Sequence, residues 1–288
     1  SIFSPIFLIY PVAEIEVLAR KEVFIFILFI LHTIISTLNN NLKRISKLII
    51  LPLSILIWEP VVFFLPLWIF IDLVNLKEKN YKINLFNELI FYFPGLLIAI
   101  IFIINPLTPE EHFQMEQVLK NEFKEVCYMS CALLKNKSSI YQQFEANLGK
   151  YSLEVFVRYF LIILIGFGPL FTLVYYSRLK IEKNIFPKNI NLLSIFLFLL
   201  SPVLLLFAMG YDWGRWVNIS YVMCLITYFY LYKNNFITLD TKKLNLNKLN
   251  LLKQKYFLYI FIIYAFTWNP KTVITGDVAS FPLYRIIY

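Results

Sequence analysis

Long apolar runs separated by short polar stretches dominate the chain. A helix that crosses a membrane needs about 20 mainly apolar residues. Runs that approach this length occupy residues 22–38, 84–104, 153–177, 190–209 and 217–232, and a shorter run lies near 257–268. The pattern predicts a set of transmembrane helices.

The apolar run at residues 48–76 is too long for one span. As a single helix rising 1.5 Å per residue it would measure about 43 Å, whereas the hydrocarbon core of a bilayer is roughly 30 Å thick. Prolines, which remove helical hydrogen bonds, interrupt the run at Pro52, Pro60 and Pro66. We predict two short helices that turn at Trp58-Glu59-Pro60. A single kinked and tilted helix is the alternative.

Composition supports the membrane assignment. The 288 residues are 59% hydrophobic and 16% charged, whereas ordinary soluble domains are roughly 45–50% apolar and about 25% charged. The mean hydropathy is +0.68. We expect one all-α integral-membrane domain over residues 1–288, a polytopic transmembrane helical bundle of about eight spans, two of them short and proline-broken. Because the chain starts at Ser1 without a Met or a signal-peptide pattern, we interpret it as a fragment or trimmed chain that can lack N-terminal spans.

The basic residues follow the pattern of membrane proteins, whose short cytoplasmic loops are rich in Lys and Arg. The formal net charge of +9 forms no basic face with interleaved aromatic residues, which argues against nucleic-acid binding. One set of loops holds Lys43, Arg44 and Lys47; Lys77, Lys79 and Lys82; Arg178, Lys180, Lys183 and Lys188; and six lysines between Lys233 and Lys255. We assign these loops to the cytoplasmic side, with residues 233–256 as a basic linker along the anionic membrane surface.

The opposite set of loops carries most of the candidate chemistry, and we assign it to the extracytoplasmic side. It contains the turn at Glu59, the turn at Asp212–Arg215, Arg158 near the start of its span, the long 105–152 segment and both ends of the chain.

A helix is predicted inside the 105–152 loop. Thr108 and Glu111 have the spacing of a capping box, and Pro109 occupies the first helical position. An apolar stripe follows, formed by Met115, Val118, Leu119, Phe123 and Val126. We expect an amphipathic helix that lies on the membrane or on the bundle.

Motifs for metal binding, disulfide formation and nucleotide binding are incomplete or absent in this sequence. His112 and Glu116 are spaced i and i+4 but lack a third ligand, so no metal site is predicted. Cys127 and Cys131 could form a disulfide only if the helix unwinds there. The sequence contains no phosphate-binding glycine loop, dinucleotide fingerprint or nucleophile elbow. We expect no cofactor, and the absence of such a loop argues against an ATP-driven pump.

The segment Asp212-Trp213-Gly214-Arg215 has two interpretations. In the first, Asp212 and Arg215 form an interfacial ion pair, with Trp213 and Trp216 as aromatic anchors at the membrane surface. In the second, Arg215 holds a phosphate or pyrophosphate through its two-pronged guanidinium, and Asp212 orients it or acts as a base. Gly210 and Gly214 are expected to loosen the helix ends at this turn.

Two further segments on the same side carry charges. Glu59, at the tip of the predicted helical hairpin, either faces water or lines a cavity as a general base. The stretch "EIEVLARKEVF" at residues 14–24 carries Arg20, Lys21 and Glu22 just outside the first span. Its simplest interpretation is an interfacial amphipathic helix.

Three of these short segments together resemble a known class of protein. The segments "LARKE", "WEP" and "DWGRW", in this layout of spans, are similar to bacterial polytopic glycan-assembly proteins, the Wzy-type O-antigen and capsule polymerases and their EpsG-like relatives. The most specific element is Asp212–Trp216. Where related polymerases carry a His before the Glu of the outward turn, this chain has Trp58.

The resemblance implies a fold, a location and a reaction. The fold is like that of the C-type glycosyltransferases (GT-C), in the bacterial inner membrane, with the site on the extracytoplasmic face. The reaction joins oligosaccharides carried on polyprenyl diphosphate. Glu59 or Asp212 would activate an acceptor hydroxyl, and the substrate-binding residues would be Arg20, Lys21, Arg158, Arg215 and Trp213. Membrane lipid and the lipid-linked glycan would be the partners, and the resemblance leaves the oligomeric state open.

Two other functions compete with this one. A transporter or flippase of lipid-linked glycans would place charges near the bilayer midplane and show inverted repeats. The sequence shows no repeat, and its charges are expected to cluster at one face. A non-catalytic membrane subunit would tolerate substitution of the charges on that face.

Overall fold

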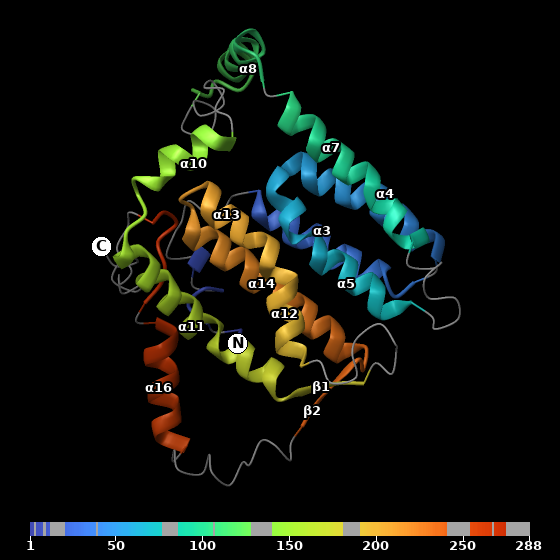
Figure 1. The fold of residues 1–288 in the computed structure, drawn as a ribbon, viewed down its shortest axis with the longest axis vertical. Coiled ribbons are helices and arrows are strands. Elements are labelled where there is room, and N and C mark those ends of the chain that lie inside the picture. The colour runs from blue at the N-terminus through green and yellow to red at the C-terminus, as the bar shows by residue number, and fades with distance from the viewer. Residues whose placement is uncertain are drawn as a thin grey trace.

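The chain folds into a bundle of helices with one short β-ribbon, as Figure 1 shows. The computed structural model describes residues 1–2, 4–7, 10–11, 21–38, 40–76, 86–105, 107–127, 140–180, 191–240, 254–266 and 268–274. Within these residues the prediction of a mainly α-helical protein is confirmed.

Eleven α-helices and three short 3₁₀ helices are bounded as follows. The α-helices are α3 (Glu22–Ile35), α4 (Asn40–Ile57), α5 (Leu65–Asn75), α7 (Phe93–Ile104), α8 (Pro109–Glu122), α10 (Ile140–Leu148), α11 (Leu153–Tyr175), α12 (Leu192–Leu200), α13 (Leu204–Met209), α14 (Trp213–Lys233) and α16 (Gln254–Phe266) within the described residues. The 3₁₀ helices are η1 (Glu59–Phe64), η2 (Ile90–Tyr92) and η3 (Ser201–Val203). The strands are β1 (Ser177–Leu179) and β2 (Ile237–Leu239).

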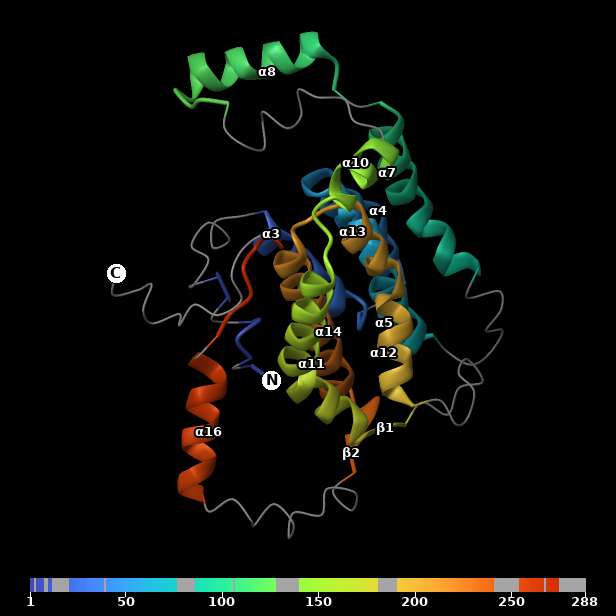
Figure 2. The same ribbon diagram turned by 60° about the vertical axis from the view of Figure 1, so that its left-hand side comes forward.

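Helix α14 forms the centre of the bundle. Figures 1 and 2 show α11, α12 and α13 beside it, with α3 and α5 on another side and α4 and α7 farther out. Most of its residues are buried, from Trp213 to Leu231. The expected run at 217–232 is therefore a helix, and it is covered by protein along most of its length.

Three helical stretches in the described part of the chain are long and apolar enough to cross a membrane. They are Phe86–Ile104, Leu153–Tyr175 and Leu192–Met209. Helix α3 is apolar but shorter, and α5 and α16 have only 11 and 13 residues. A membrane protein is thus supported, whereas the expected total of about eight spans is not shown.

The predicted break within residues 48–76 is confirmed. Helix α4 ends at Ile57, Trp58 is extended with φ −158° and ψ 106°, and the next helical turn begins at Glu59 with Pro60 in its first turn. Proline suits the first turn of a helix because it has no backbone N–H to leave unbonded there. The chain then returns through α5.

The prediction of a basic loop before this hairpin is wrong. Helix α4 begins at Asn40 and includes Lys43, Arg44 and Lys47. Arg44 is exposed, but Lys43 and Lys47 are buried. Lys47 cannot act as a solvated topology anchor, because its ammonium group is enclosed by carboxylates on neighbouring helices.

The bundle has two distinct ends, which Figure 2 shows along its vertical axis. At the Arg215 end, α3, α11 and α14 begin and α4 and α13 end. At the ribbon end, β1 and β2 pair antiparallel, with Arg178 opposite Thr238. The turns at Trp58 and at Asp212–Arg215 therefore lie at the same end of the bundle, whereas the predicted basic loops at residues 77–82 and 183–188 lie outside the described residues. The ribbon itself was not predicted, because each strand has only three residues.

The helix predicted in the 105–152 loop is confirmed, and of its two expected positions, on the membrane or on the bundle, the second is not seen. Thr108 and Glu111 form both hydrogen bonds of a capping box. Figures 1 and 2 show α8 standing apart from the bundle, and Val118, Phe123 and Val126 of the stripe are exposed. The stripe does not pack on the described part of the bundle.

The predictions for the cysteine pair and for the basic linker fall only partly within the described residues. Helix α8 ends at Glu122, so Cys127 lies beyond it, and Cys127 is disulfide-bonded. Cys131, which the sequence left open as its partner, lies outside the described residues, as do residues 241–253 of the basic linker.

Candidate functional site

Arg215 is the centre of an ion-pair cluster at one end of the bundle. It lies in the first turn of α14, where Asp212 is the residue before the helix. Its Nη1 donates to Asp212 Oδ2 at 2.9 Å, and its Nε donates to Glu22 Oε1 at the start of α3. The predicted Asp212–Arg215 pair is confirmed. The second partner, Glu22, was recognised in the sequence only as part of a charged stretch.

Trp58 brings the helical hairpin to the same cluster. The guanidinium carbon of Arg215 lies 5.6 Å from the centre of the Trp58 ring, within the range of a cation–π contact. Glu59 follows Trp58 and is exposed. Three segments far apart in the sequence, around residues 22, 58 and 215, therefore meet at one guanidinium.

Burial within the cluster is uneven. The side chains of Glu22, Arg215 and Asp212 are 3%, 13% and 29% exposed. Within the described residues, Glu22 Oε2 is buried and accepts no hydrogen bond. A buried acceptor without a donor is costly, so Arg215, which donates to the other carboxylate oxygen, is the partner that offsets the burial of Glu22.

The charges constrain what Arg215 can bind. Its guanidinium already faces two carboxylates, so a phosphate group would have to compete with one of them. Asp212 is the partner that is more open to solvent, and it is the one that an anion could replace. Lys21 is exposed at the start of α3, which places another cation next in sequence to Glu22. Arg20 lies outside the described residues.

Trp213 lies inside the protein and not at its surface. Its Nε1 donates to the carbonyls of Phe207 at 2.8 Å and Gly210 at 2.9 Å. Rings of other residues surround it, with centroids 5.2–5.5 Å away, and these are Tyr151, Phe156, Tyr159 and Phe207. Trp213 and Trp216 are both buried. The expectation of aromatic anchors at the membrane surface is therefore wrong, and packing is the role that this position favours for Trp213.

Tyr151 supports the same turn from outside α11. Its hydroxyl lies 2.9 Å from the carbonyl oxygen of Ala208 and 3.2 Å from that of Gly210. Burial raises the pKa of this hydroxyl above its usual value. Tyr151 therefore keeps its proton at neutral pH and remains a donor.

Gly214 is required for space and not for a flexible helix end. A β-carbon at this position would lie 1.8 Å from the carbonyl oxygen of Lys271, and none of the described glycines has a positive φ. The Gly214 N–H donates to Thr272 O at 3.2 Å, and the Ile274 N–H donates to Tyr211 O at 3.0 Å. The segment 268–274 is thus bonded directly to the turn that carries Asp212.

Arg158 is held by its own set of contacts. Its Nη2 pairs with Glu154 at 2.6 Å, and its Nη1 donates to Ile274 O at 3.3 Å. It lines an apolar groove of about 670 Å³ along α11, together with Trp268. The segment 268–274 therefore connects the surroundings of Arg158 to those of Arg215.

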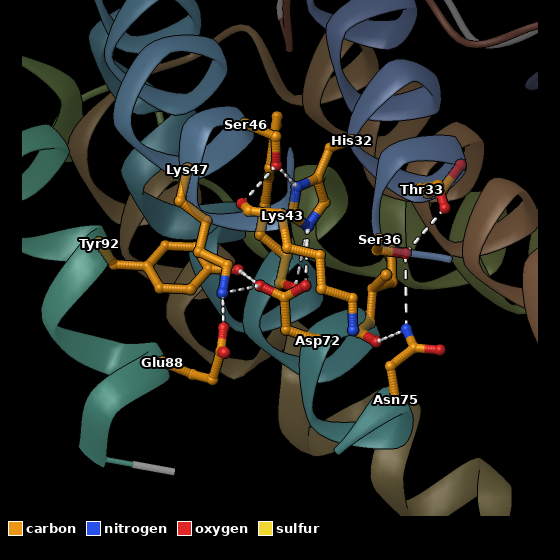
Figure 3. Close-up of polar contacts among 12 residues, drawn as sticks. His32, Thr33, Ser36, Lys43, Ser46, Lys47, Asp72, Asn75, Glu88 and Tyr92 are labelled. Carbon is orange, nitrogen blue, oxygen red and sulfur yellow. Dashed lines mark hydrogen bonds and ion pairs between the residues drawn. The ribbon is translucent and has the colours of Figure 1, made fainter. Parts of the chain in front are cut away.

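A second polar cluster lies buried near the ribbon end, and the sequence analysis missed it. Figure 3 shows Lys47, Asp72 and Glu88 in contact, with His32 and Tyr92 beside them. The expectation that charges gather at one face only is therefore wrong. The sequence signal was Asp72, a single acid within the apolar helix α5.

No protein-family model, curated protein or solved structure matches this chain. Among the described residues, no group of three or more His, Cys, Asp or Glu side chains could hold a metal ion. Any functional assignment therefore rests on the geometry of the two clusters and on the three short segments of the resemblance.

Proposed function

We propose that this protein acts on lipid-linked oligosaccharides at the Arg215 end, and that this end faces the extracytoplasmic side of a bacterial inner membrane. The reaction is the polymerisation or transfer of glycans carried on polyprenyl diphosphate. The observation that carries the proposal is the meeting of Glu22, Trp58 and Arg215, because each belongs to one of the three segments that resemble glycan polymerases. A GT-C-like fold is part of the same proposal.

Arg215 and Lys21 bind the diphosphate in this proposal. A guanidinium suits a phosphate because two parallel N–H bonds match two oxygens. Asp212, the more exposed partner of Arg215, yields its place to a phosphoryl oxygen. Arg158, at its apolar groove, contributes to binding of the lipid carrier.

The carboxylates act on the acceptor sugar. The acceptor hydroxyl oxygen bonds to the anomeric carbon of the donor, and the bond from that carbon to the diphosphate breaks. The diphosphate leaves with the electron pair of that bond, and the hydroxyl proton passes to a carboxylate. Glu59 is the exposed candidate for this base, and Asp212 becomes available when phosphate displaces it from Arg215.

A reconstituted assay tests the proposal. The purified protein in lipid nanodiscs receives a polyprenyl-diphosphate-linked oligosaccharide, and products are separated by length. Wild type is expected to yield longer glycans. Glu59→Gln removes the proposed base and should lose at least about 90% of the rate, since a general base typically contributes a factor of 10² or more. Arg215→Lys removes the two parallel N–H bonds to phosphate and should lose at least about 90% of the rate as well. Arg44→Lys is the matched control, because Arg44 is an exposed arginine on α4. Equal rates in all four proteins would reject the proposal.

A transporter or flippase of lipid-linked glycans is the second candidate. The buried cluster around Lys47 and Asp72 favours it, because ionisable residues inside a membrane bundle are common in transport pathways. A flippase would move a fluorescent lipid-linked glycan across proteoliposomes without lengthening it. The transferase would lengthen the glycan at one face of the membrane. A non-catalytic subunit would do neither.

A further inference from the structure

The cluster near the ribbon end joins four elements of the bundle. His32 lies on α3, Lys47 on α4, Asp72 on α5 and Tyr92 on η2, as Figure 3 shows. His32, Lys47, Asp72 and Tyr92 are all buried. Glu88, in the helical stretch Phe86–Ile104, is 13% exposed. Among these five described residues, Glu88 is therefore the one that reaches water.

Asp72 uses only one of its carboxylate oxygens in hydrogen bonds. Its Oδ2 accepts from the Tyr92 hydroxyl at 2.5 Å and pairs with Lys47 Nζ at 3.1 Å. Its Oδ1 is buried and has no hydrogen-bond donor among the described residues. His32 is an ionisable group close to Oδ1, with its Nε2 3.9 Å away.

Both ring nitrogens of His32 face hydrogen-bond acceptors. Nδ1 lies 3.3 Å from Ser46 Oγ, and that hydroxyl already donates its only proton to Lys43 O at 3.0 Å. Nε2 lies 3.4 Å from the carbonyl oxygen of Trp68 and faces Asp72 Oδ1. A neutral imidazole has one N–H, so one nitrogen lone pair would face an oxygen. An imidazolium would donate on both sides.

From this geometry we infer that His32 and Asp72 form a proton-binding site that is reached from the ribbon end through Glu88 and Lys47. The bound proton resides on His32 Nε2, and Asp72 Oδ1 is its counter-charge. This site lies outside the Arg215 cluster, so it does not depend on the function proposed there. It gives the bundle one exchangeable positive charge within its buried core.

The route of the proton follows the printed contacts. Glu88 takes a proton from hydronium in the surrounding water, and Lys47 passes one of its own protons to Asp72 Oδ2 while receiving one from Glu88. The protonated Asp72 carboxyl group then turns its O–H toward His32, whose Nε2 lies 3.9 Å from the Oδ1 position, and gives the proton to Nε2. Each step breaks one O–H or N–H bond and forms another, so that Glu88, Lys47 and Asp72 return to their starting states and His32 gains one proton and one charge.

Other charged and titratable groups around His32 determine the net charge of the cluster. Helix α4 contributes Lys43 and Lys47, and α5 contributes Asp72. The Phe86–Ile104 stretch contributes Glu88 and Tyr92. Helix α14 contributes Tyr230, whose hydroxyl contacts Ser36 and Asn75. Two lysines and two carboxylates cancel, so a proton on His32 leaves the cluster with one net positive charge. Removal of a carboxylate should therefore weaken proton binding by His32, and removal of a lysine should strengthen it.

Nitrogen NMR of the His32 ring tests the inference directly. The chain has two His residues, so ¹⁵N-histidine labelling of the His112→Gln variant isolates His32. We expect the His32 spectrum in nanodiscs to change from the neutral ring to the imidazolium between about pH 8 and pH 5. Asp72→Asn should lower the midpoint by more than one pH unit, and Lys47→Met should raise it by more than one unit.

The controls separate proton binding from a purely structural cluster. Asp240→Asn removes a carboxylate that pairs with Arg178 at the ribbon end and should leave the His32 midpoint unchanged. If Asp72→Asn does not fold, Lys47→Met and wild type still decide the result. A His32 ring that keeps one protonation state across this pH range in the folded protein would overturn the inference. Midpoints unchanged by both substitutions would overturn it as well.

Discussion

Arg215 and Glu22, which are 193 residues apart in the sequence, form an ion pair that joins the start of α14 to the start of α3. Glu22 is almost fully buried, and Arg215 is the cation paired with its carboxylate. The pair fixes the geometry of the end of the bundle where Trp58 and Asp212 also lie.

Removal of Arg215 is expected to destabilise the protein strongly. Arg215→Ala leaves the Glu22 carboxylate buried without a counter-charge, and such losses cost about 3–5 kcal/mol. Arg215→Ala combined with Glu22→Gln should recover more than half of that loss, because no buried charge remains. Thermal unfolding in detergent measures both. As a control, Arg44→Ala removes an exposed cation–π contact with Phe91 and should cost no more than about 1 kcal/mol. Equal losses in Arg215→Ala and Arg44→Ala would show that the pair is not structural.

A methyl group at Gly214 is expected to displace the segment 268–274. The Lys271 carbonyl occupies the position of the new β-carbon, and the backbone hydrogen bond to Thr272 would be lost with it. Gly214→Ala should therefore make this segment more sensitive to protease and lower the melting temperature by several degrees. Gly149→Ala is the control, because nothing lies within 4 Å of its added methyl. Identical digestion of both variants would contradict the close contact.

Trp213→Phe separates packing from substrate binding. The ring stays aromatic, but the hydrogen bonds from Nε1 to Phe207 and Gly210 are lost. We expect a loss of about 1 kcal/mol in unfolding free energy, with the glycan-transfer rate per folded molecule unchanged within a factor of two. A rate that falls at least tenfold in a variant with wild-type stability would assign Trp213 to the substrate.

Thiol labelling tests which face the Arg215 end occupies. Cys127 is disulfide-bonded near α8, and Cys224 is buried in α14. In intact cells, a membrane-impermeant maleimide should label Cys127 only after mild reduction, because disulfides persist in oxidising compartments. Lys233→Cys, an exposed position near the ribbon end, should become reactive only after the membrane is opened. The reverse labelling pattern would show that the Arg215 end faces the cytoplasm.

Local rules predicted part of this structure. Pro60 and the length limit of a span located the hairpin turn, and Thr108 with Glu111 located the start of α8. The Asp212–Arg215 pair was visible because its members are three residues apart. Each of these features depends on neighbours in the sequence.

The contacts that were missed depend on distant residues. Nothing near Glu22 indicates that its partner is Arg215, and nothing near Lys47 distinguishes it from a loop lysine. Lys47 is buried because Asp72 and Glu88 approach from other helices. Gly214 has a backbone conformation open to any residue, and only the approach of Lys271 shows why glycine is required there.

The length of surface glycans in living cells tests the central proposal most directly. A strain that lacks the gene receives wild type, Arg215→Lys, Glu59→Gln or the control Arg44→Lys, with membrane levels of each protein confirmed by blotting. We expect long glycans with wild type and Arg44→Lys, and single repeat units with Arg215→Lys and Glu59→Gln. Wild-type chain lengths in both of those variants would contradict it, and the Arg215 cluster would then be a structural junction of the bundle.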